Sequence, residues 1–345
     1  MKTPGMFIYP FTARGDHTLY NPYIDNVFHA LDPYFVCVNK HKPSQTGLMN
    51  VVQYFFKIRY LHLNWIEELP DKKAGFFQTL FLLVFIVITR ITHKRIIWTL
   101  HNKASHSRRH RWIKNRIFKL LARYSNYIIT HSQGGVEFIK QLNPGISTDR
   151  ILYLPHPVEG KKLDGHREIR YDLLLWGKML RYKGVHLFLE YLEERKMLHK
   201  YRILIAGSFA DQDYERELQE YECSSIHIVN EFVKEHELLD IMHHSRIILF
   251  TYQHESVLSS GALMDSLISG KPVVGPDIGA FHDMKQQGLI HTYNSWEELI
   301  AVIDHLVENP ERIDAKRLHE FIEENSWDQY GRRLFRWLRK MELPY

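Results

Sequence analysis

Cysteine is scarce in this chain: Cys37 and Cys223 are the only two among 345 residues, and they lie far apart. This excludes a disulfide-rich scaffold, and their apolar neighbours are typical of buried thiols in a reducing compartment. The N-terminal residues MKTPGMFIYPF contain no apolar run long enough for a signal peptide. The composition, 45% hydrophobic and 25% charged, is that of a globular protein, so the sequence predicts a cytoplasmic location.

An apolar segment that could span a bilayer, which takes roughly 20 residues, is also lacking. The most hydrophobic stretch, AGFFQTLFLLVFIVIT over Ala74–Thr89, has 16 residues and contains Gln78. Because it is apolar on all sides, it is expected either to be enclosed by protein or to lie partly in lipid.

Acidic residues are absent from Arg90 to Arg123, a segment that carries eleven Lys or Arg. The net charge of the whole chain is only +5, so positive charge is concentrated here. A run of charges is often just a solvated face. Here it directly follows the apolar stretch, which favours a peripheral membrane surface, with apolar side chains in the lipid and cations against anionic headgroups.

The chain does contain a regular alternation of short apolar runs and helical patterns, which is typical of parallel α/β sheets. The alternation stops at a polar segment and restarts, so we expect an N-terminal domain over 1–155, a linker over 156–170 and a C-terminal domain over 171–345. Both domains are predicted to be doubly wound and Rossmann-like, with the active site in a central cleft and the final helices packed back on the first domain. The expected strands are Met6–Pro10, Phe35–Val38, Tyr60–Asn64, Ile96–Leu100, Tyr127–His131, Ile151–Leu154, Asp172–Trp176, Arg202–Ala206, His227–Val229, Ile247–Tyr252, Pro272–Val274 and Leu289–Thr292, and the expected helices include Tyr23–Leu31, Leu48–Ile58, Gly75–Ile91, Trp112–Tyr124, Gly135–Leu142, Val185–Glu194, Tyr214–Glu220 and Glu235–His244.

The stretch HESVLSSGALMDSLISGKPVVGPD has the order loop, helix, strand of such a sheet. Ser259, Ser260 and Gly261 precede its helical run and are therefore expected at a helix N-terminus, where free N–H groups and the helix dipole attract an anion. Gly261 has no Cβ, so an anionic group could approach the backbone closely. A second basic stretch, WGKMLRYKG, follows the first expected strand of the C-terminal domain. Its cations, Lys178, Arg181 and Lys183, are the residue types that neutralise a diphosphate, although an ordinary basic surface loop would look the same.

These two stretches together resemble the nucleotide-sugar domain of GT-B glycosyltransferases, most closely the large retaining family numbered four and related bacterial polysaccharide glycosyltransferases. The segments IIWTLHN, YIITHS and ILYLPHPV resemble later strands and the linker of that family's first domain more loosely. The resemblance implies a GT-B fold and a donor site at matching positions. In that site Lys178 and Lys183 would bind the diphosphate, Ser259, Ser260 and Gly261 the phosphate or sugar, Asp265 the ribose, and Phe232 and Val233 the base, while His101 would contact the donor sugar or support charge on the leaving phosphate.

The sequence departs from the family's paired acids. Val257 stands where the first acid is expected, and Glu255, two residues earlier, is an alternative for that place. The retaining outcome therefore does not follow. An inverting reaction would need a carboxylate base from the N-terminal domain, and Asp16 is the candidate. It lies in a loop beside the expected cleft that begins at Gly15, which is itself expected to be a donor-binding residue. A plain turn residue is the simpler interpretation of Asp16.

The function predicted from these features is a metal-independent glycosyltransferase that uses a UDP- or GDP-sugar and no other cofactor. Its acceptor is expected to be lipid-linked or a polysaccharide at the inner face of the cell membrane, where the protein binds an anionic surface, and nucleic acid is not an expected partner. The 22 histidines form no metal motif, and basic residues with helix amides can stabilise a departing diphosphate without a metal. Two alternatives are a GT-B sugar-nucleotide isomerase and a non-catalytic membrane- or nucleic-acid-binding protein. The sugar, the nucleotide, the acceptor, the stereochemical outcome and the oligomeric state stay open.

Overall fold

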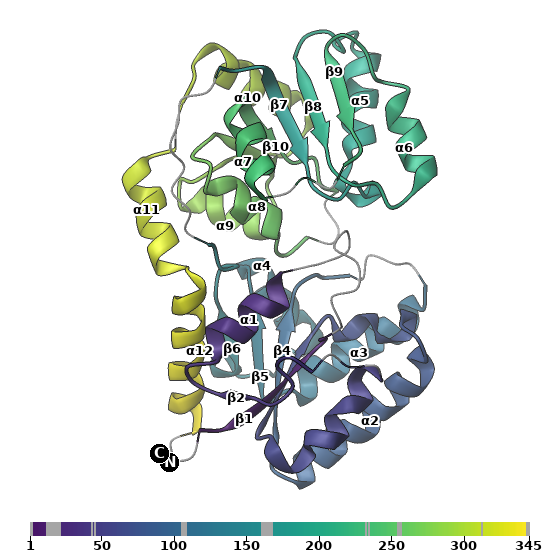
Figure 1. The fold of residues 1–345 in the computed structure, drawn as a ribbon, viewed down its shortest axis with the longest axis vertical. Helices are drawn as coiled ribbons and strands as arrows, with labels where there is room; N and C mark the ends of the chain where they lie inside the picture. The colour runs from purple at the N-terminus through teal and green to yellow at the C-terminus, as the bar shows by residue number, and fades with distance from the viewer. Residues whose placement is uncertain are drawn as a thin grey trace. The chain divides into compact units, whose positions relative to one another are not determined.

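The computed structural model describes residues 3–11, 22–42, 44, 46–104, 109–159, 168–231, 233, 235–253, 257–311 and 313–342. The chain divides into two compact units, one made of Met1–Pro157 with Asn325–Tyr345 and the other of Val158–Glu324. Each unit is built on a six-stranded sheet whose neighbouring strands are all parallel (Figure 1). The two sheets with their covering helices confirm the predicted pair of Rossmann-like α/β domains.

The sheet of the first unit has the strand order β2-β1-β3-β4-β5-β6. Every one of these strands overlaps a run expected from the sequence, because buried parallel strands are short, continuous apolar segments. Their bounds are β1 Gly5–Tyr9, β2 Val36–Cys37, β3 Tyr60–Asn64, β4 Arg95–Leu100, β5 Tyr127–Thr130 and β6 Ile151–Tyr153.

Helices cover both faces of this sheet. Helices α1 (Tyr23–Leu31) and α12 (Trp327–Glu342) share one apolar cluster with Ile97 of β4. The next residue, Trp98, points to the opposite face, where its ring lies 6.1 Å from that of Phe118. That face is covered by α2 (Gly75–Ile91), α3 (Arg111–Tyr124) and α4 (Gln133–Leu142), with the short 3-10 helix η3 (Ile66–Asp71) beneath α2 and α3.

The segment expected as an α-helix over Leu48–Ile58 is instead a 3-10 helix, η2, over Gly47–Lys57. Its first turn is held from outside the segment, because the backbone N–H of Leu48 donates to the side-chain oxygen of Gln78 at 2.9 Å. The run is also rich in β-branched and aromatic residues, which have weaker helix propensity. The α-helix prediction for this segment is therefore wrong in type, although its position is right.

The sheet of the second unit has the order β12-β11-β10-β7-β8-β9. Its strands and helices again lie where the sequence predicts them, and the described residues add two helices that the sequence did not suggest, the short 3-10 helix η5 and α9. The bounds are β7 Tyr171–Trp176, η5 Arg181–Lys183, α5 Val185–Glu194, β8 Ile203–Ala206, α6 Gln212–Gln219, β9 Ile226–Val229, α7 Glu235–His243, β10 Ser245–Leu249, α8 Gly261–Leu267, β11 Val273–Pro276, α9 Gly279–Gln286, β12 His291–Tyr293, α10 Trp296–Glu308 and α11 Ala315–Glu324; in the first unit a further 3-10 turn, η4, covers Thr148–Arg150.

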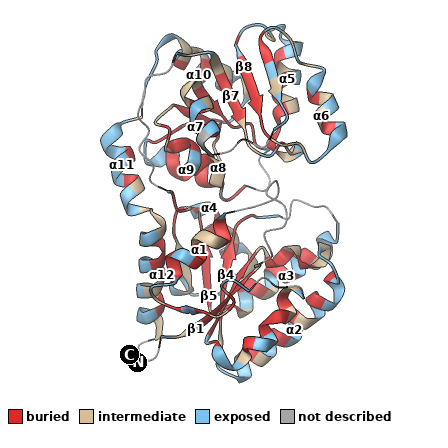
Figure 2. Ribbon diagram, in the orientation of Figure 1, coloured by how far each residue is buried: buried red, intermediate tan, exposed pale blue. Residues whose placement is uncertain are grey.

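Burial follows this layering. The strands of both sheets are mostly buried and most helices are buried on one side (Figure 2). Cys37 is buried as expected, whereas Cys223 is half-buried. Among the described helices, none combines the length and the apolarity needed to cross a membrane.

Candidate functional site

The loop after β7 touches the loop after β8 backbone to backbone. Gly177 has φ +95°, which favours glycine, and a Cβ on Gly207 would lie 1.9 Å from the Gly177 carbonyl oxygen. Since β7 and β8 are neighbouring parallel strands, both loops leave the sheet at its carboxyl edge. This edge is where ligands bind in open α/β sheets.

Lys183 lies beneath the first of these loops and is buried, with 7% of its surface exposed. Its Nζ donates to the carbonyl oxygen of Trp176 at 3.1 Å and lies 5.7 Å from the ring centre of Tyr252. In the described part of the chain, no carboxylate is within ion-pair distance. Desolvation lowers the pKa of this ammonium to about 8, so a cation is held here without a counter-charge.

Gly177 also leaves room for that ammonium. A Cβ at this position would lie 3.0 Å from the Nζ of Lys183. A cavity lined by Lys183, Trp176 and Tyr252 has a volume of only about 10 Å³, which is at the lower limit for a single water molecule. A glycine at position 177 therefore serves both the turn and the cation.

The three cations of the basic loop do not act alike. Lys178 is exposed, whereas Arg181 forms an ion pair with Glu217 of α6 and is directed to that helix. The prediction that Arg181 belongs to the same cluster as Lys178 and Lys183 is therefore not supported by the geometry. The sequence could not show this pairing, because Glu217 lies 36 residues away.

Ser260 caps helix α8. Its Oγ accepts from the backbone N–H of Leu263 at 3.1 Å and lies 3.5 Å from the hydroxyl of Tyr252. Tyr252 thus contacts Ser260 with its hydroxyl and Lys183 with its ring, so the structure brings these two predicted donor-binding residues together through one buried tyrosine. Ser259 and Gly261 flank the cap as expected, and an anion-binding role for the three residues stays a prediction.

The other predicted donor residues have different surroundings. Asp265 lies exposed on α8. Val257, at the place of the first acid, is buried in the apolar cluster of the unit together with Phe281, and Val233 packs partly buried against the same cluster. A carboxylate at position 257 would be desolvated there, which accounts for the missing acid in physical terms. The predictions for Gly15, Asp16, Phe232 and Glu255 lie outside the described residues and stay predictions.

His101 follows β4 in the first unit and is 3% exposed. Its ring stacks on Trp65 with centroids 4.1 Å apart, and Tyr23 meets it edge-on at 4.8 Å. The amide of Asn64 donates to the carbonyl of Tyr9 at 3.0 Å, so its oxygen faces the Nε2 of His101, 3.2 Å away. Nε2 therefore carries the proton, and burial holds the pKa of His101 well below its usual range.

Three further histidines, which the sequence analysis did not select, lie near His101. His131 and His156 have ring centroids 5.4 Å from one another, and His131 lies 5.4 Å from His101. His62 on β3 contacts Thr99 at 2.8 Å. Burial lowers the pKa of His62 and His131 to about 3 and that of His156 to about 4, so all are neutral at pH 7.

A positional signal could have found this cluster. His101 and His131 each directly follow a strand, and the strands, β4 and β5, are neighbours. His131 Nδ1 donates to the carbonyl of Leu154 at 2.9 Å, so its Nε2 accepts from the Tyr23 hydroxyl at 2.9 Å. In the described ranges, no group of three or more His, Cys, Asp or Glu side chains is placed to hold a metal ion, and the predicted absence of a metal stays a prediction.

Residues 161–332 match the family described as "Glycosyl transferases group 1". No curated protein sequence is significantly similar to this chain. Among solved structures, HepE of Anabaena in complex with UDP and glucose is 14% identical, with a TM-score of 0.66 over 98% of this chain and 100% of that one. AviGT4, a glycosyltransferase involved in avilamycin A biosynthesis, is 12% identical, with a TM-score of 0.62 over 98% and 97%. An Escherichia coli structure described as trehalose-6-phosphate bound with UDP-2-fluoro glucose is 14% identical, with a TM-score of 0.60 over 83% and 73%.

The chain has the GT-B fold, with two Rossmann-like domains, as the sequence predicts. It belongs to the group 1 glycosyl transferases and is a glycosyltransferase.

Proposed function

We propose that this glycosyltransferase transfers a sugar from a UDP- or GDP-sugar to a lipid-linked or polysaccharide acceptor, without a metal ion, at the inner face of the cell membrane. The solved neighbours that contain UDP or UDP-sugars support a nucleotide-sugar donor. Within the group of candidate donors, UDP-sugars are therefore the first to test. Lys178, Lys183, Ser259, Ser260, Gly261 and Asp265 are the proposed donor-binding residues, and His101 and Asp16 the proposed catalytic ones.

The observation that carries the donor site is the buried ammonium of Lys183. Its pKa is about 8 in the folded protein and 10.5 in the unfolded chain. The unfolded chain therefore takes up the proton first, so the stability that is present above pH 10.5 falls with the pH and the loss is complete once the pH has fallen through 8. The burial therefore costs about 3 kcal/mol of unfolding free energy at neutral pH. A diphosphate at the edge of the sheet would place negative charge beside this ammonium, which has no carboxylate partner among the described residues, and would offset this cost.

The test replaces Lys183 with Met and measures both stability and donor binding. If the ammonium serves a ligand, the variant gains about 2 kcal/mol of stability, since one hydrogen bond to Trp176 is lost with the charge, while its affinity for UDP-glucose or another active donor falls at least about tenfold. Arg181→Met, which removes a cation from the same loop, is the matched control and should keep donor affinity. A Lys183→Met protein that is less stable and binds the donor like the parent would assign Lys183 a structural role only.

The proposed role of His101 requires a local change in the first unit. With 3% exposure and its Nε2 bonded to Asn64, the imidazole can meet a donor sugar only if the groups that cover it move, and the rings of Trp65 and Tyr23 are among its contacts. As a neutral group it can contact a hydroxyl without adding charge. If the contact forms in the transition state, His101→Gln should reduce kcat more than donor affinity. A variant with the same kcat and the same donor affinity as the parent would show that His101 only packs within the first unit.

The acceptor side of the proposal depends on an exposed apolar and basic surface formed by α2 and α3. Helix α2 buries Leu82, Phe85 and Ile86 but leaves a second apolar face exposed, so it is not enclosed by protein within the described residues. Monomeric soluble proteins rarely expose such a contiguous patch. This apolar–basic surface consists of Phe76, Phe77, Leu80, Leu83, Val84, Val87 and Ile91 of α2, Phe56 of η2, and Trp112, Arg111, Arg116, Lys119 and Arg123 of α3.

The cations of this surface lie beside its aromatic residues, which is the arrangement expected of a peripheral membrane site. Arg116 lies 5.5 Å from the ring of Trp112, which is 69% exposed, and Arg123 lies 5.5 Å from the ring of the adjacent Tyr124. A soluble sugar nucleotide needs no such surface, which argues against the isomerase alternative. A lipid-linked or membrane-bound acceptor does.

Vesicle sedimentation tests the membrane site. The protein should sediment with phosphatidylglycerol vesicles at low salt and be released at high salt, because the cations act within about a Debye length of the headgroups. Phe76→Asp combined with Leu80→Asp should abolish sedimentation without loss of donor binding. Val229→Asp changes an exposed apolar residue of the other unit and should have no effect. Equal sedimentation of all three proteins would contradict the site.

A further inference from the structure

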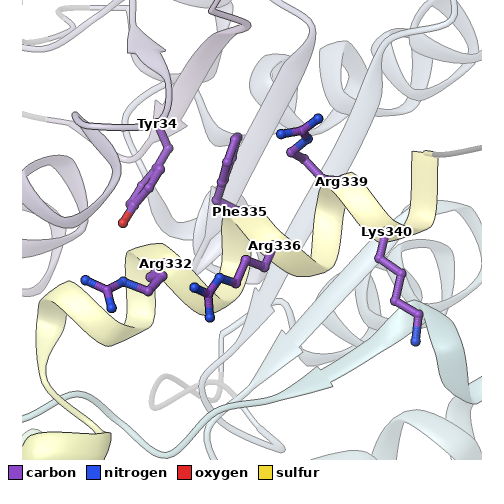
Figure 3. Close-up of a pocket in the computed structure, with 6 residues that line it drawn as sticks. All are labelled: Tyr34, Arg332, Phe335, Arg336, Arg339 and Lys340. Atoms are coloured by element: carbon purple, nitrogen blue, oxygen red, sulfur yellow. The ribbon is translucent and has the colours of Figure 1, made fainter.

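A second basic surface lies along helix α12. Together with the turn after α1 it forms an open groove of about 530 Å³ (Figure 3). None of its residues belongs to the donor site or to the apolar–basic surface. The groove is lined by Tyr34, Arg332, Phe335, Arg336, Arg339 and Lys340.

The sequence of α12 separates its two faces. Tyr330, Leu334 and Leu338 recur at helical spacing and are buried against α1 and the sheet. Gly331 lets the two helices approach closely, because a Cβ there would lie 1.9 Å from the carbonyl oxygen of Ala30. Because this face of the helix is fixed against α1, the cations line another side of it: Arg336, Arg339 and Lys340 follow Arg332 by four, seven and eight residues.

Aromatic rings form the wall of the groove between the cations. Tyr34 and Phe335 stack with centroids 4.9 Å apart and an interplanar angle of 21°. The guanidinium of Arg339 lies 5.8 Å from the ring of Phe335, on the side away from Tyr34 in Figure 3. Both faces of the Phe335 ring are therefore occupied within the protein, which leaves no platform there for a stacked nucleobase.

The positive charge of the groove is not neutralised within the described residues. No carboxylate there forms an ion pair with Arg332, Arg336, Arg339 or Lys340, and the nearby Glu342 is bound to Arg59 at 2.6 Å. Like charges three and four residues apart on a helix repel one another. An anionic ligand that bridged them would remove this repulsion.

The surface is also not suited to insertion into lipid. No large apolar side chain of α12 is exposed among the described residues, in contrast to α2. Moreover, α12 covers the sheet face opposite to that of α2 and α3. Ile97 of β4 packs in the same cluster as α12, whereas the next residue, Trp98, points to the other face and contacts Phe118 of α3. A membrane in contact with α2 would therefore not reach α12.

We propose that the α12 groove binds a linear anionic glycan, a chain of sugars that carries carboxylate, phosphate or sulfate groups. Arg332 and Lys340 are about 12 Å apart along the helix axis, so an extended chain rather than a single ion is needed to meet all the cations. Three of the four cations are arginines, whose planar forks bind such groups in a bidentate manner. The inference rests on the proposed polysaccharide acceptor. The glycan bound in the α12 groove would be a stretch of that acceptor polymer.

Oligogalacturonate as the anionic glycan and dextran as the neutral one test this proposal with the full-length protein. The parent should bind oligogalacturonate in a salt-dependent manner and dextran not at all. Arg332→Gln combined with Arg336→Gln and Arg339→Gln should weaken this binding at least about tenfold. The matched control, Arg111→Gln with Arg116→Gln and Lys119→Gln, removes the same charge from α3 and should instead weaken vesicle sedimentation.

The alternatives give different results in the same assays. Equal losses of glycan affinity in both triple variants would reduce the effect to bulk charge and overturn the proposal. A single-stranded oligonucleotide or an anionic vesicle that binds more tightly than oligogalacturonate and depends on the same α12 arginines would also overturn it. Donor binding, followed by the thermal shift with UDP-glucose, should be unchanged in the α12 variant. A parent protein that binds no nucleotide sugar but retains α12-dependent glycan binding would refute the donor proposal alone.

Discussion

Acid should destabilise the first unit through its buried histidines, and His62 provides the simplest test. Its side chain is completely buried, and desolvation alone lowers its pKa to about 3. The unfolded chain takes up a proton near pH 6.5, whereas the folded one does not. Stability is therefore fully present above pH 6.5 and is lost as the pH falls from there toward 3. Between pH 7.5 and pH 5.0 the loss from this residue is about 2 kcal/mol.

His62→Gln removes this proton uptake but keeps a polar side chain that can bond to Thr99. The substitution itself will cost some stability at both pH values, so the informative quantity is the difference between the two losses. Hydrogen exchange of the β3 amides, Tyr60–Asn64, reports the opening free energy of the unit that contains His62. After correction for intrinsic exchange rates, the parent should lose about 2 kcal/mol more than the variant between pH 7.5 and pH 5.0.

An equal loss in the parent and in His62→Gln would refute the reasoning, because it would mean that the buried imidazole does not control the acid sensitivity. His227, an exposed histidine on β9 of the other unit, supplies the control substitution His227→Gln. Burial also lowers the pKa of three other histidines, His101, His131 and His156, so the variant should keep a substantial acid sensitivity.

Two further predictions follow from single contacts. Glu67 is buried, and desolvation raises its pKa to about 8, so it destabilises the folded protein only above pH 4.5, and this destabilisation grows as the pH rises toward 8. The stability gained by Glu67→Gln should therefore be about 3 kcal/mol larger at pH 7.5 than at pH 5.0, as measured by the same exchange experiment. Ser260→Ala should lower the unfolding free energy of the second unit by about 1 kcal/mol through loss of the α8 cap, and urea unfolding without ligand checks this; an unchanged midpoint would show that the cap contributes nothing.

The strands could be predicted from the sequence because parallel strands buried on both faces need continuous apolar runs, such as Ile96–Leu100 or Tyr127–His131. Helix α2 was equally clear in position, from its apolar length. What periodicity could not decide was whether its second face is covered, since that depends on elements distant in the sequence. The 3-10 form of Gly47–Lys57 depends in the same way on Gln78, 30 residues from Leu48.

The candidate site was predictable where one loop holds the relevant residues. Lys183 was selected because a basic loop follows a strand. Its burial, and the lack of a carboxylate partner among the residues that the structure describes, could be known only from the packing around Trp176 and Tyr252. Arg181 looked equivalent in sequence and is not, since Glu217 of α6 binds it. The histidine cluster was missed because each member is isolated in the sequence, and only the strand order brings His101 and His131 together.

The two basic surfaces of the first unit should act independently. They lie on opposite faces of one sheet and share no residue, and sites that share no partner usually contribute additively, within about 0.5 kcal/mol. A protein that carries both triple variants, on α3 and on α12, should therefore lose vesicle binding and glycan binding by the same factors as each variant does alone. Both losses can be measured with one preparation in the presence of oligogalacturonate and phosphatidylglycerol vesicles. A coupling clearly larger than that limit would mean that lipid and glycan compete for one surface, which the separation of α2 from α12 by the sheet does not allow.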